Sequence, residues 1–244
     1  MTMGNDLKPP PLTAGDALFL DFDGTLAGLQ EDPDTVFLAP GLGKVLENIS
    51  SKLNGALTII SGRDAEDLSG RVPTGLWRIG NHGLIELAPD EVPPEERASA
   101  PDAVSGAFRD ISVRFAGTRV ETKGPILALH YRQAPEAVAG IELALAEAGL
   151  SDAGYRVQHG KFVFEAKPET AHKGKAIARM MGTAPFAGRR AVMIGDDTTD
   201  EDAFEAVNQL GGLTVKVGAG DTFAQYRLAS VETVHEYLKE LAGA

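Results

Sequence analysis

The chain contains no cysteine, and this absence excludes several kinds of chemistry. Without thiols there are no disulfides, no thiolate nucleophile and no cysteine-ligated zinc site. Long hydrophobic runs are also missing, since none approaches the roughly 20 residues of a membrane span. Residues 1–16 include three consecutive prolines and lack the apolar core of a signal peptide. We therefore expect a mobile tail over residues 1–16, a cytoplasmic location and no membrane partner.

Basic residues are scarce relative to acidic ones. The 23 lysines and arginines stand against 35 aspartates and glutamates, which gives a net charge of −12. Such a surface disfavours nucleic acid as a partner, because phosphate backbones bind to basic faces. A small phosphorylated ligand is still compatible with it, since a few local cations suffice. Protein partners are unknown from the sequence.

The most informative stretch is a short apolar run that ends in two acids. Residues 17–20 are Ala-Leu-Phe-Leu, and Asp-Phe-Asp-Gly-Thr follows at residues 21–25. We interpret the run as a buried strand of a parallel sheet, at whose carboxyl end ligands bind in open α/β folds. Alternation along a strand places Asp21 and Asp23 on the same side. One of these two carboxylates must bind a proton, or both must share a cation, which suits nucleophilic, acid-base or metal chemistry. A plain Asp-Gly turn is the alternative.

Two further segments carry candidate phosphate-binding groups. The apolar residues 56–60 end in Ser61-Gly62-Arg63, where exposed backbone N–H groups and a helix start favour an anion. A helix cap is the alternative role for Ser61. Lys173 opens a later helical segment. A lysine in the first turn opposes the helix dipole, so it indicates either a bound anion or a plain solvated surface.

Residues 80–83, Gly-Asn-His-Gly, follow a predicted strand at 76–79. The two glycines allow the backbone to approach another group closely. Asn81 and His82 are therefore candidates for substrate binding, with a simple hairpin turn as the alternative.

Five acids in seven residues follow the apolar strand predicted at 190–195. The pair Thr199 and Asp202 fits a capping box. The remaining aspartates offer the hard oxygen ligands that Mg²⁺ takes, and they are Asp196, Asp197 and Asp200.

A change of composition after residue 88, to Pro, Glu, Asp and Ser, indicates that the chain leaves one domain. Helical and strand patterns follow, and they end in a predicted hairpin with His159-Gly160 as its turn. We expect a core domain over residues 17–90 and 169–244, with an inserted α/β cap domain over residues 91–168.

The motifs at residues 21–25, Ser61, Lys173 and 195–200 resemble, in content and order, those of the haloacid dehalogenase superfamily of phosphohydrolases. The resemblance implies an α/β fold: a Rossmann-like core with a parallel sheet and an inserted cap of the C2 type. It implies that Asp21 is the nucleophile, that Asp23 is the general acid and base, and that Ser61 and Lys173 hold the phosphoryl group. The implied cofactor is Mg²⁺, with the ligand set Asp21, Asp23, Asp196, Asp197 and Asp200.

Beyond the N-terminal tail, nearly the whole chain is similar to the trehalose-6-phosphate phosphatases. The similarity is carried by residues 80–83, 121–124, 130–132, 160–165 and the stretch GDDTTDEDAF from Gly195 to Phe204. It implies a small sugar phosphate as partner, with trehalose 6-phosphate hydrolysed through an aspartyl-phosphate. The implied substrate-binding residues are Gly62, Arg63, Asn81, His82, Glu121, Lys123, Arg132, Lys161 and Glu165.

Several alternatives stay open. Without the resemblance, the charges at 121–132 would be interpreted as surface ion pairs between neighbouring strands. A phosphatase of another sugar phosphate, of the sucrose-phosphate or mannosyl-glycerate type, would use the same fold, and a phosphomutase is conceivable. A non-catalytic sensor of a phosphorylated ligand is disfavoured, because it would have no use for Asp23.

Overall fold

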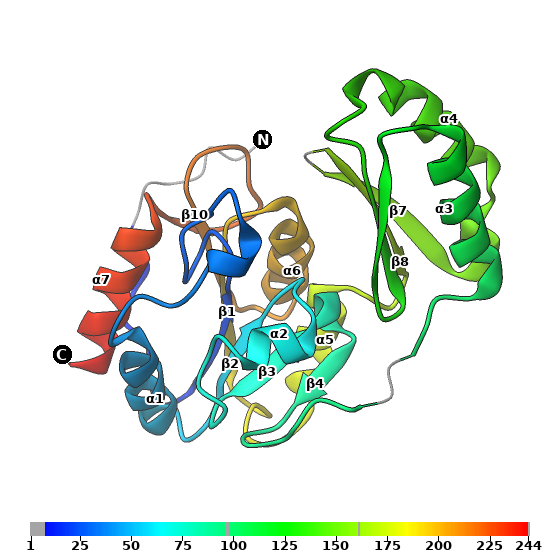
Figure 1. The fold of residues 1–244 in the computed structure, drawn as a ribbon. Helices are drawn as coiled ribbons and strands as arrows, with labels where there is room; N and C mark the ends of the chain where they lie inside the picture. Colours follow the sequence, from blue (N-terminus) through cyan, green and yellow to red (C-terminus); the bar gives the residue numbers. More distant parts are fainter. Residues whose placement is uncertain (1–7, 96–97, 161, 244) are drawn as a thin grey trace. The chain divides into compact units, whose positions relative to one another are not determined.

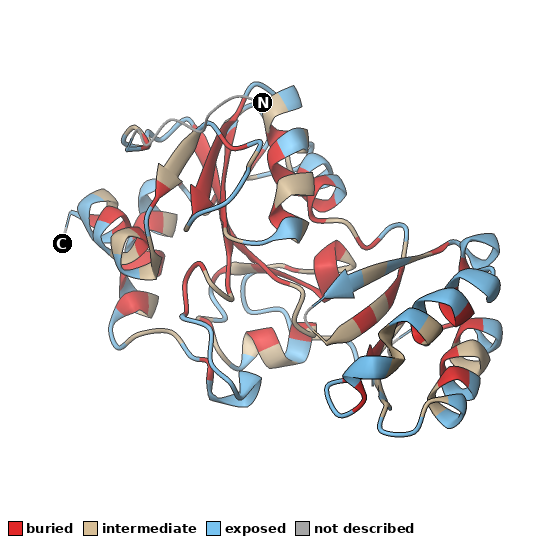
Figure 2. Ribbon diagram, turned by 90° about the horizontal axis from the view of Figure 1, so that it is seen from above, coloured by how far each residue is buried: buried red, intermediate tan, exposed pale blue. Residues whose placement is uncertain are grey.

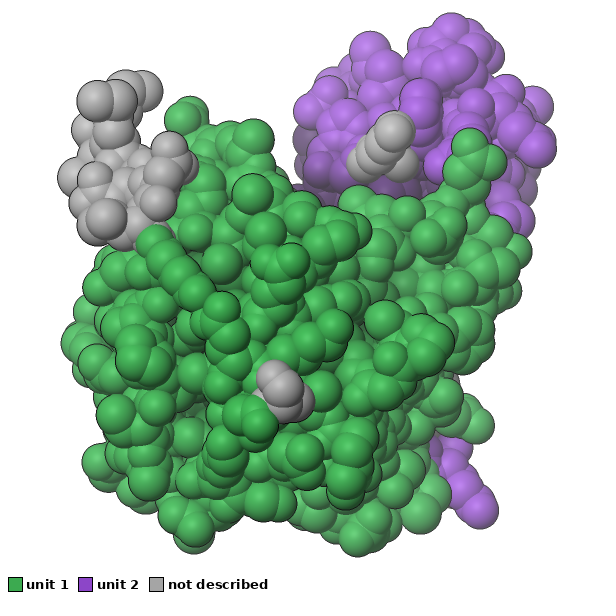
Figure 3. All heavy atoms as spheres, turned by 90° about the vertical axis from the view of Figure 1, so that its left-hand side faces the viewer, with its two compact units in different colours: residues 1–93, 172–244 green, residues 94–171 purple. Residues whose placement is uncertain are grey.

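The structure is a computed structural model that describes residues 8–95, 98–160 and 162–243. The chain forms two compact units, coloured separately in Figure 3. The first comprises the chain up to Pro93 and from His172 onward, and the second comprises Pro94–Ala171, where the sequence predicts an insert over residues 91–168. Lys161, a predicted substrate-binding residue, lies outside the described residues.

A seven-stranded sheet is the centre of the first unit, with the order β11-β10-β9-β1-β2-β3-β4 (Figure 1). Neighbouring strands are parallel except for β3 and β4. The central strands are buried at almost every position, which explains their near-continuous apolar sequence. The strands are β1 (Asp16–Asp21), β2 (Leu57–Ile60), β3 (Trp77–Gly80), β4 (Ile85–Leu87), β9 (Arg190–Gly195), β10 (Leu213–Val217) and β11 (Tyr226–Leu228).

Helices cover both faces of this sheet. Helix α1 (Leu42–Lys52) packs with α7 (Val231–Ala242) on one face, and α5 (Lys173–Met180) packs with α6 (Thr198–Gln209) on the other (Figure 1). Figure 2 shows buried and exposed positions on each of these helices, and the buried positions of α1 and α7 are apolar residues and one tyrosine. Within the described residues, none of the helices combines the length and apolar character that a membrane span needs.

The strand register sets the positions of the candidate side chains. Leu20 pairs with Ile194, and Asp21 pairs with Ile60. The carboxyl ends of β1, β2 and β9 therefore lie side by side at one edge of the sheet. Asp21, Ser61 and the acids after Gly195 all come from that edge, as ligand-binding residues of open α/β sheets do.

The second unit has its own sheet and its own core. Its antiparallel sheet has the order β5-β6-β8-β7, and its two helices cover one face (Figure 1). Phe108, Leu129 and Phe164 belong to the apolar cluster between helices and sheet. The elements are α3 (Asp102–Arg114), β5 (Arg119–Lys123), β6 (Ile126–His130), α4 (Val138–Glu147), β7 (Tyr155–Gly160) and β8 (Val163–Pro168).

Two local predictions are wrong. His159 and Gly160 are not a hairpin turn but the end of β7, because Gly160 pairs with Val163 and the His159 ring stacks on Phe164 at 4.2 Å. The capping box of α6 is formed by Asp197 and Asp200 rather than by Thr199 and Asp202. The second error places the helix start two residues too late.

The N-terminal residues that the structure describes are bonded to the first unit. Asp16 accepts hydrogen bonds from the backbone and hydroxyl of Thr13, and its carboxylate pairs with Arg190 at 2.7 Å. Tyr237 of α7 donates from its hydroxyl to the carbonyl of Pro10 at 2.8 Å. These bonds connect the chain before β1 to β9 and α7.

Candidate active site

A buried lysine lies between two buried aspartates. Asp21 is the last residue of β1, and Lys173 is the first residue of α5. The Lys173 ammonium donates to Oδ1 of Asp21 at 2.6 Å and to Oδ1 of Asp200 at 2.7 Å. Only 3 % of Lys173 is exposed, so the alternative of a solvated surface lysine is wrong.

Asp196 completes a cluster of three acids. One carboxylate oxygen from each of Asp21, Asp196 and Asp200 lies within 4.8 Å of the other two. The Thr25 hydroxyl donates to Oδ1 of Asp196 at 3.3 Å. Oδ2 of Asp200 accepts from the backbone N–H groups of Asp196 at 2.9 Å and Asp197 at 3.1 Å. The cluster is therefore fixed by the β1 loop on one side and by the start of α6 on the other.

Negative charge exceeds positive charge in this cluster. Burial and the neighbouring carboxylates raise the pKa of Asp21 well above its ordinary value, although Lys173 opposes the shift. Burial raises the pKa of Asp200 to about 6, and burial together with Asp197 raises the pKa of Asp196. Burial works against the charge of Lys173, but Asp200 and Asp21 outweigh it and raise its pKa. A dication would balance this surplus, and the all-oxygen donor set fits Mg²⁺.

Asp23 lies outside the three-acid cluster and is paired with Arg63. Arg63 donates from Nε to Oδ2 of Asp23 at 2.8 Å and from Nη2 to Oδ1 at 2.7 Å. The strand ends at Asp21, so the alternation that predicted one shared side does not extend to Asp23. Both carboxylate oxygens of Asp23 are therefore bound by one guanidinium, which fixes the direction of the carboxyl group.

Asp197 also lies outside the cluster, because it caps α6. Its Oδ1 accepts from the backbone N–H of Thr199 at 2.7 Å and of Asp200 at 3.1 Å. Burial opposes its ionisation, but Lys173 and these hydrogen bonds hold its pKa below the ordinary value. Of the five predicted metal ligands, the structure thus brings Asp21, Asp196 and Asp200 together.

Ser61 is buried directly after β2 and does not cap a helix. Its hydroxyl accepts from the backbone N–H of Arg63 at 3.1 Å, while Asp64 caps the short helix α2 (Ala65–Ser69). Gly62 has no room for a side chain, since a Cβ there would lie 2.5 Å from Cε1 of His82. Ser61, Gly62 and His82 are therefore neighbours at the sheet edge that also carries Asp21.

Asn81 and His82 form the bend between β3 and β4, as the hairpin alternative predicts. Both have left-handed backbone angles, with φ of 53° and 56°. The Asn81 side chain accepts from the backbone N–H of Ala65 at 3.0 Å and donates to Asp64 at 3.2 Å. Asn81 thus holds the start of α2, and substrate binding by either residue stays a prediction.

The predicted sugar-binding acids of the second unit share one face of its sheet. Glu121 and Glu165 flank Ala128 of the strand between them, because each is paired with it in register. This face is opposite the helices, since Phe164 beside Glu165 belongs to the helix-side core. The ammonium nitrogen of Lys123 lies 3.7 Å from Oε1 of Glu121. The guanidinium of Arg132 lies 5.8 Å from the Phe162 ring.

In each unit, one contact of a predicted site residue involves a residue to which the sequence assigned no role. His130 Nε2 lies 2.7 Å from Oε2 of Glu121, and this bond helps to lower the pKa of Glu121 although burial opposes the shift. The Lys216 ammonium donates to the backbone carbonyls of Asp196 and Val217. A single lysine within the apolar run 213–217 was a usable signal, because a charge on a buried strand needs a partner.

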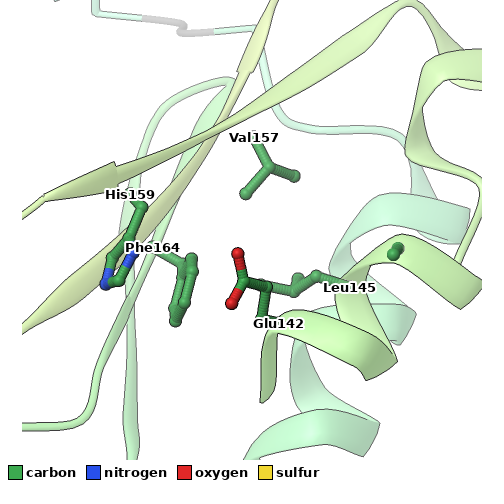
Figure 4. Close-up of a pocket in the computed structure, with 6 residues that line it drawn as sticks. Glu142, Leu145, Val157, His159 and Phe164 are labelled. Carbon is green, nitrogen blue, oxygen red and sulfur yellow. The ribbon is translucent and has the colours of Figure 1, made fainter. Parts of the chain in front are cut away.

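A pocket of about 230 Å³ lies on the helix side of the second unit. Figure 4 shows Glu142 and Leu145 of α4 facing Val157, His159 and Phe164 of the sheet. Of the predicted site residues that the structure describes, none lines this pocket. The pocket is therefore separate from the face that carries Glu121 and Glu165.

The first unit, with a buried aspartate after β1, a lysine at the start of α5 and acids after β9, has the fold of the haloacid dehalogenase-like hydrolases. A solved structure of such a hydrolase from Bacteroides thetaiotaomicron matches with a TM-score of 0.70 at 13 % identity, covering 93 % of this chain and 99 % of that one. The predicted fold class is confirmed.

Within this class, the trehalose-phosphatase family model matches residues 19–232, and the chain belongs to this family. A trehalose-6-phosphate phosphatase of Escherichia coli strain K12 is 38 % identical over 245 residues, or 97 % of this chain and 90 % of that protein. A solved Aspergillus fumigatus trehalose-6-phosphate phosphatase has a TM-score of 0.69 at 27 % identity, covering 97 % and 99 %. The chain is accordingly a phosphatase.

Proposed function

We propose that this protein hydrolyses trehalose 6-phosphate to trehalose and inorganic phosphate, with Mg²⁺ as cofactor. The buried contact of Lys173 with Asp21 and Asp200 carries the proposal, because it joins a candidate nucleophile, a cation for phosphate and a metal-binding acid. The names of the E. coli and A. fumigatus relatives support the substrate. Together, the Lys173 contact and the names of the relatives favour hydrolysis of the phosphate ester of a sugar over other reactions.

Asp21, Asp196 and Asp200 would hold the metal ion. When bound, Mg²⁺ supplies positive charge that offsets these acids and attracts the phosphoryl oxygens. In the first step, a carboxylate oxygen of Asp21 bonds to phosphorus in line with the sugar oxygen, whose bond to phosphorus breaks. Lys173, with its charge held by two acids, neutralises the phosphoryl group as it transfers, and Ser61 donates a hydrogen bond.

Asp23 is the proposed general acid and base. It gives a proton to the departing sugar oxygen, so that trehalose leaves as a neutral alcohol. It then takes a proton from water, whose oxygen bonds to phosphorus while the bond to Asp21 breaks. Phosphate is released and Asp21 is restored. Since Arg63 binds both oxygens of Asp23, one of these hydrogen bonds must open during each transfer.

Residues on the open face of the second unit would bind the disaccharide. Carboxylates accept hydrogen bonds from hydroxyls, and Lys123 and Arg132 donate to them. Glu121 and Glu165 lie on either side of the small Ala128, which leaves a gap between two acceptors. This arrangement suits a polyol such as a sugar ring.

A panel of sugar phosphates tests the substrate. Phosphate release is measured for trehalose 6-phosphate, sucrose 6-phosphate, glucose 6-phosphate and a mannosyl-glycerate phosphate, with Mg²⁺ or with EDTA. We expect trehalose 6-phosphate to be hydrolysed fastest, and only with Mg²⁺. Equal rates on all four would remove the proposed substrate, and full activity in EDTA would remove the metal.

Asp21→Asn tests the nucleophile. An amide cannot form the aspartyl-phosphate, so kcat should fall by at least about 10⁴-fold while the circular dichroism spectrum is unchanged. Incubation with substrate followed by acid quenching should leave phosphate on the wild-type chain and none on the variant. Hydrolysis by Asp21→Asn at a rate near that of the wild type would exclude Asp21 as nucleophile.

A further inference from the structure

Arg63 is one member of a row of alternating charges next to the three-acid cluster. The row consists of Asp23, Arg63, Asp67 and Arg71, and we call it the charge row. Arg63 uses Nε and Nη2 for Asp23, and it donates from Nη1 to Oδ2 of Asp67 at 2.8 Å. Arg71 then donates to the other side of Asp67, from Nη2 to Oδ1 at 2.6 Å and from Nε at 2.9 Å. Arg63 and Asp67 each therefore have an opposite charge on either side, and Arg71 also lies 4.0 Å from the exposed carboxylate of Asp34.

The far end of the charge row is fixed to the backbone that follows Asp23. Arg71 Nη1 donates to the carbonyl of Val36 at 2.5 Å, and the guanidinium lies 4.8 Å from the Phe37 ring. Arg63 Nη2 also donates to the carbonyl of Pro33 at 3.0 Å. The row thus begins at Asp23 and ends on the loop that Asp23 opens.

The two arginine side chains of the charge row are buried, and their contacts fix the orientation of each guanidinium. The side chain of Arg63 is 11 % exposed and that of Arg71 is 6 % exposed. A guanidinium is planar, so two partners on different edges fix the direction of its plane. Burial opposes the charge of Asp67, but Arg71 and Arg63 outweigh it and lower the pKa of Asp67. Asp67 is consequently a fixed anion at neutral pH that holds Arg63 from the side opposite Asp23.

We propose that Asp67 is a positioning residue for the reaction: by fixing the plane of Arg63, it fixes the direction in which Asp23 presents its carboxyl group. Asp67 touches neither the three-acid cluster nor the predicted phosphate-binding groups, so it acts through Arg63. The inference rests on the proposed function, in which Asp23 protonates the departing sugar oxygen.

The chemistry of the leaving group provides a specific readout. A sugar alkoxide needs a proton as its bond to phosphorus breaks, whereas p-nitrophenolate leaves as a stable anion. Asp23 also acts as the base in the second step, which is the same for both substrates, so the comparison is made on the first step alone. Misplacement of Asp23 should slow transfer of the phosphoryl group to Asp21 far more from the sugar phosphate than from p-nitrophenyl phosphate. A general loss of structure would slow both substrates alike.

The test compares Asp67→Asn with the wild type in single-turnover experiments, which give the rate constant of phosphoryl transfer to Asp21 from trehalose 6-phosphate and from p-nitrophenyl phosphate, with KM measured beside it. We expect the transfer rate from trehalose 6-phosphate to fall about 10- to 100-fold, the range for a misplaced catalytic group, with KM changed less than about twofold. The transfer rate from p-nitrophenyl phosphate should fall less than about threefold on the same grounds. Asp67→Glu, which keeps the charge, should recover part of the loss.

Glu86→Gln is the matched control. Glu86 is a half-buried carboxylate of the first unit that also pairs with an arginine, Arg179, at 2.6 Å, but it lies outside the charge row. Its substitution should leave the ratio of the two phosphoryl-transfer rates unchanged. An equal loss on both substrates in Asp67→Asn, or no loss on either, would overturn the positioning role.

The experiments distinguish a wrong substrate assignment from a wrong role for Asp67. If the wild type hydrolyses another alkyl phosphate but not trehalose 6-phosphate, only the substrate assignment is wrong. The Asp67 comparison then holds or fails on that alkyl phosphate. A wild type that hydrolyses p-nitrophenyl phosphate but no alkyl phosphate would overturn both.

Discussion

The ammonium group of Lys173 contacts two of the three clustered aspartates and so offsets part of the negative charge of the site. Sequence alone identified it by its unusual place in the first turn of a helix, but could not show that it is buried between Asp21 and Asp200. That arrangement depends on chain segments more than 150 residues apart. The same limit explains why Arg63 was predicted to bind substrate while its contact with Asp23 was not foreseen.

Asp200 gives the site a dependence on pH at the scale of one residue. Its pKa of about 6 lies above that of an unfolded aspartate, roughly 3.9. Ionising Asp200 therefore costs folding free energy in the metal-free protein, and this cost appears as the pH rises from about 4 to 6 and persists above it. In the proposed function Mg²⁺ binds the ionised form of Asp200, so protons would compete with the metal below pH 6.

We accordingly expect the increase in Tm caused by Mg²⁺ to be larger at pH 7.5 than at pH 5. Calorimetric titration should show Mg²⁺ affinity falling by up to about tenfold per pH unit, for each proton displaced, below pH 6. The measurement is made in EDTA-treated protein, with Asp21→Asn as a control of weakened metal binding. An Mg²⁺ affinity that is the same at pH 5 and pH 7.5 would contradict the raised pKa of Asp200.

Gly24 offers a second prediction at this scale. Its φ is +81°, and a Cβ there would lie 2.1 Å from a carboxylate oxygen of Asp196. Gly24→Ala should displace Asp196 and lower kcat/KM about 100-fold, the effect of a shift of about 1 Å. Gly28→Ala is the control, because a Cβ at Gly28 meets no atom within 4 Å. Equal activity of the two variants would show that the position of Asp196 does not depend on the absence of a side chain at Gly24.

At the scale of the element, the parallel strands were the most predictable part of the fold. Their buried positions give apolar runs that end at a glycine or an acid, as β1 and β9 do. The hairpin turn of β7 and β8 was misplaced because His159 is a polar residue whose ring stacks on Phe164. Such cross-strand packing leaves no local signal in the sequence.

Arg78 of β3 is the clearest case of an element held by one side chain. It is 1 % exposed and donates from Nη2 to the carbonyls of Ala88 and Glu91, and from Nη1 to the Ser69 hydroxyl at 2.8 Å. These bonds fix the chain just before the first unit ends at Pro93.

Arg78→Met should lower the free energy of unfolding by about 2–3 kcal/mol, because it removes a buried charged donor from these part-buried carbonyls and from the Ser69 hydroxyl. Urea denaturation measures the loss, with the surface variant Lys44→Met as control, since Lys44 makes only an exposed pair with Glu47. A loss of less than about 0.5 kcal/mol, as at an ordinary surface site, would show that Arg78 does not hold this segment.

At the scale of the whole molecule, the three-acid cluster and the predicted sugar-binding acids belong to different units. Asp21, Asp196 and Asp200 come from the first, and Glu121 and Glu165 come from the second. Since each unit has its own core, substitutions on the open face of one sheet need not disturb the acids of the other. The proposed function therefore predicts that chemistry and sugar discrimination can be altered separately.

Glu165→Gln tests this separation. Loss of a charged hydrogen-bond acceptor for a hydroxyl should lower kcat/KM on trehalose 6-phosphate about 10-fold. On p-nitrophenyl phosphate, which has no sugar, the change should be within about twofold by the same argument. Glu142→Gln, in the pocket on the other side of the same sheet, should alter neither value. A similar loss on both substrates in Glu165→Gln would contradict a role limited to the sugar.

The strand register has a consequence for how this chain can vary in length between lineages. One residue inserted within β9 would turn every later side chain of that strand to the opposite face and move Asp196 away from Asp21. The loops at the amino ends of the strands, at residues 53–56, 181–189 and 210–212, carry no member of the cluster. Natural insertions and deletions should therefore accumulate in these loops. The number of residues between each strand and its site residue, at the carboxyl ends of β1, β2 and β9, should stay constant.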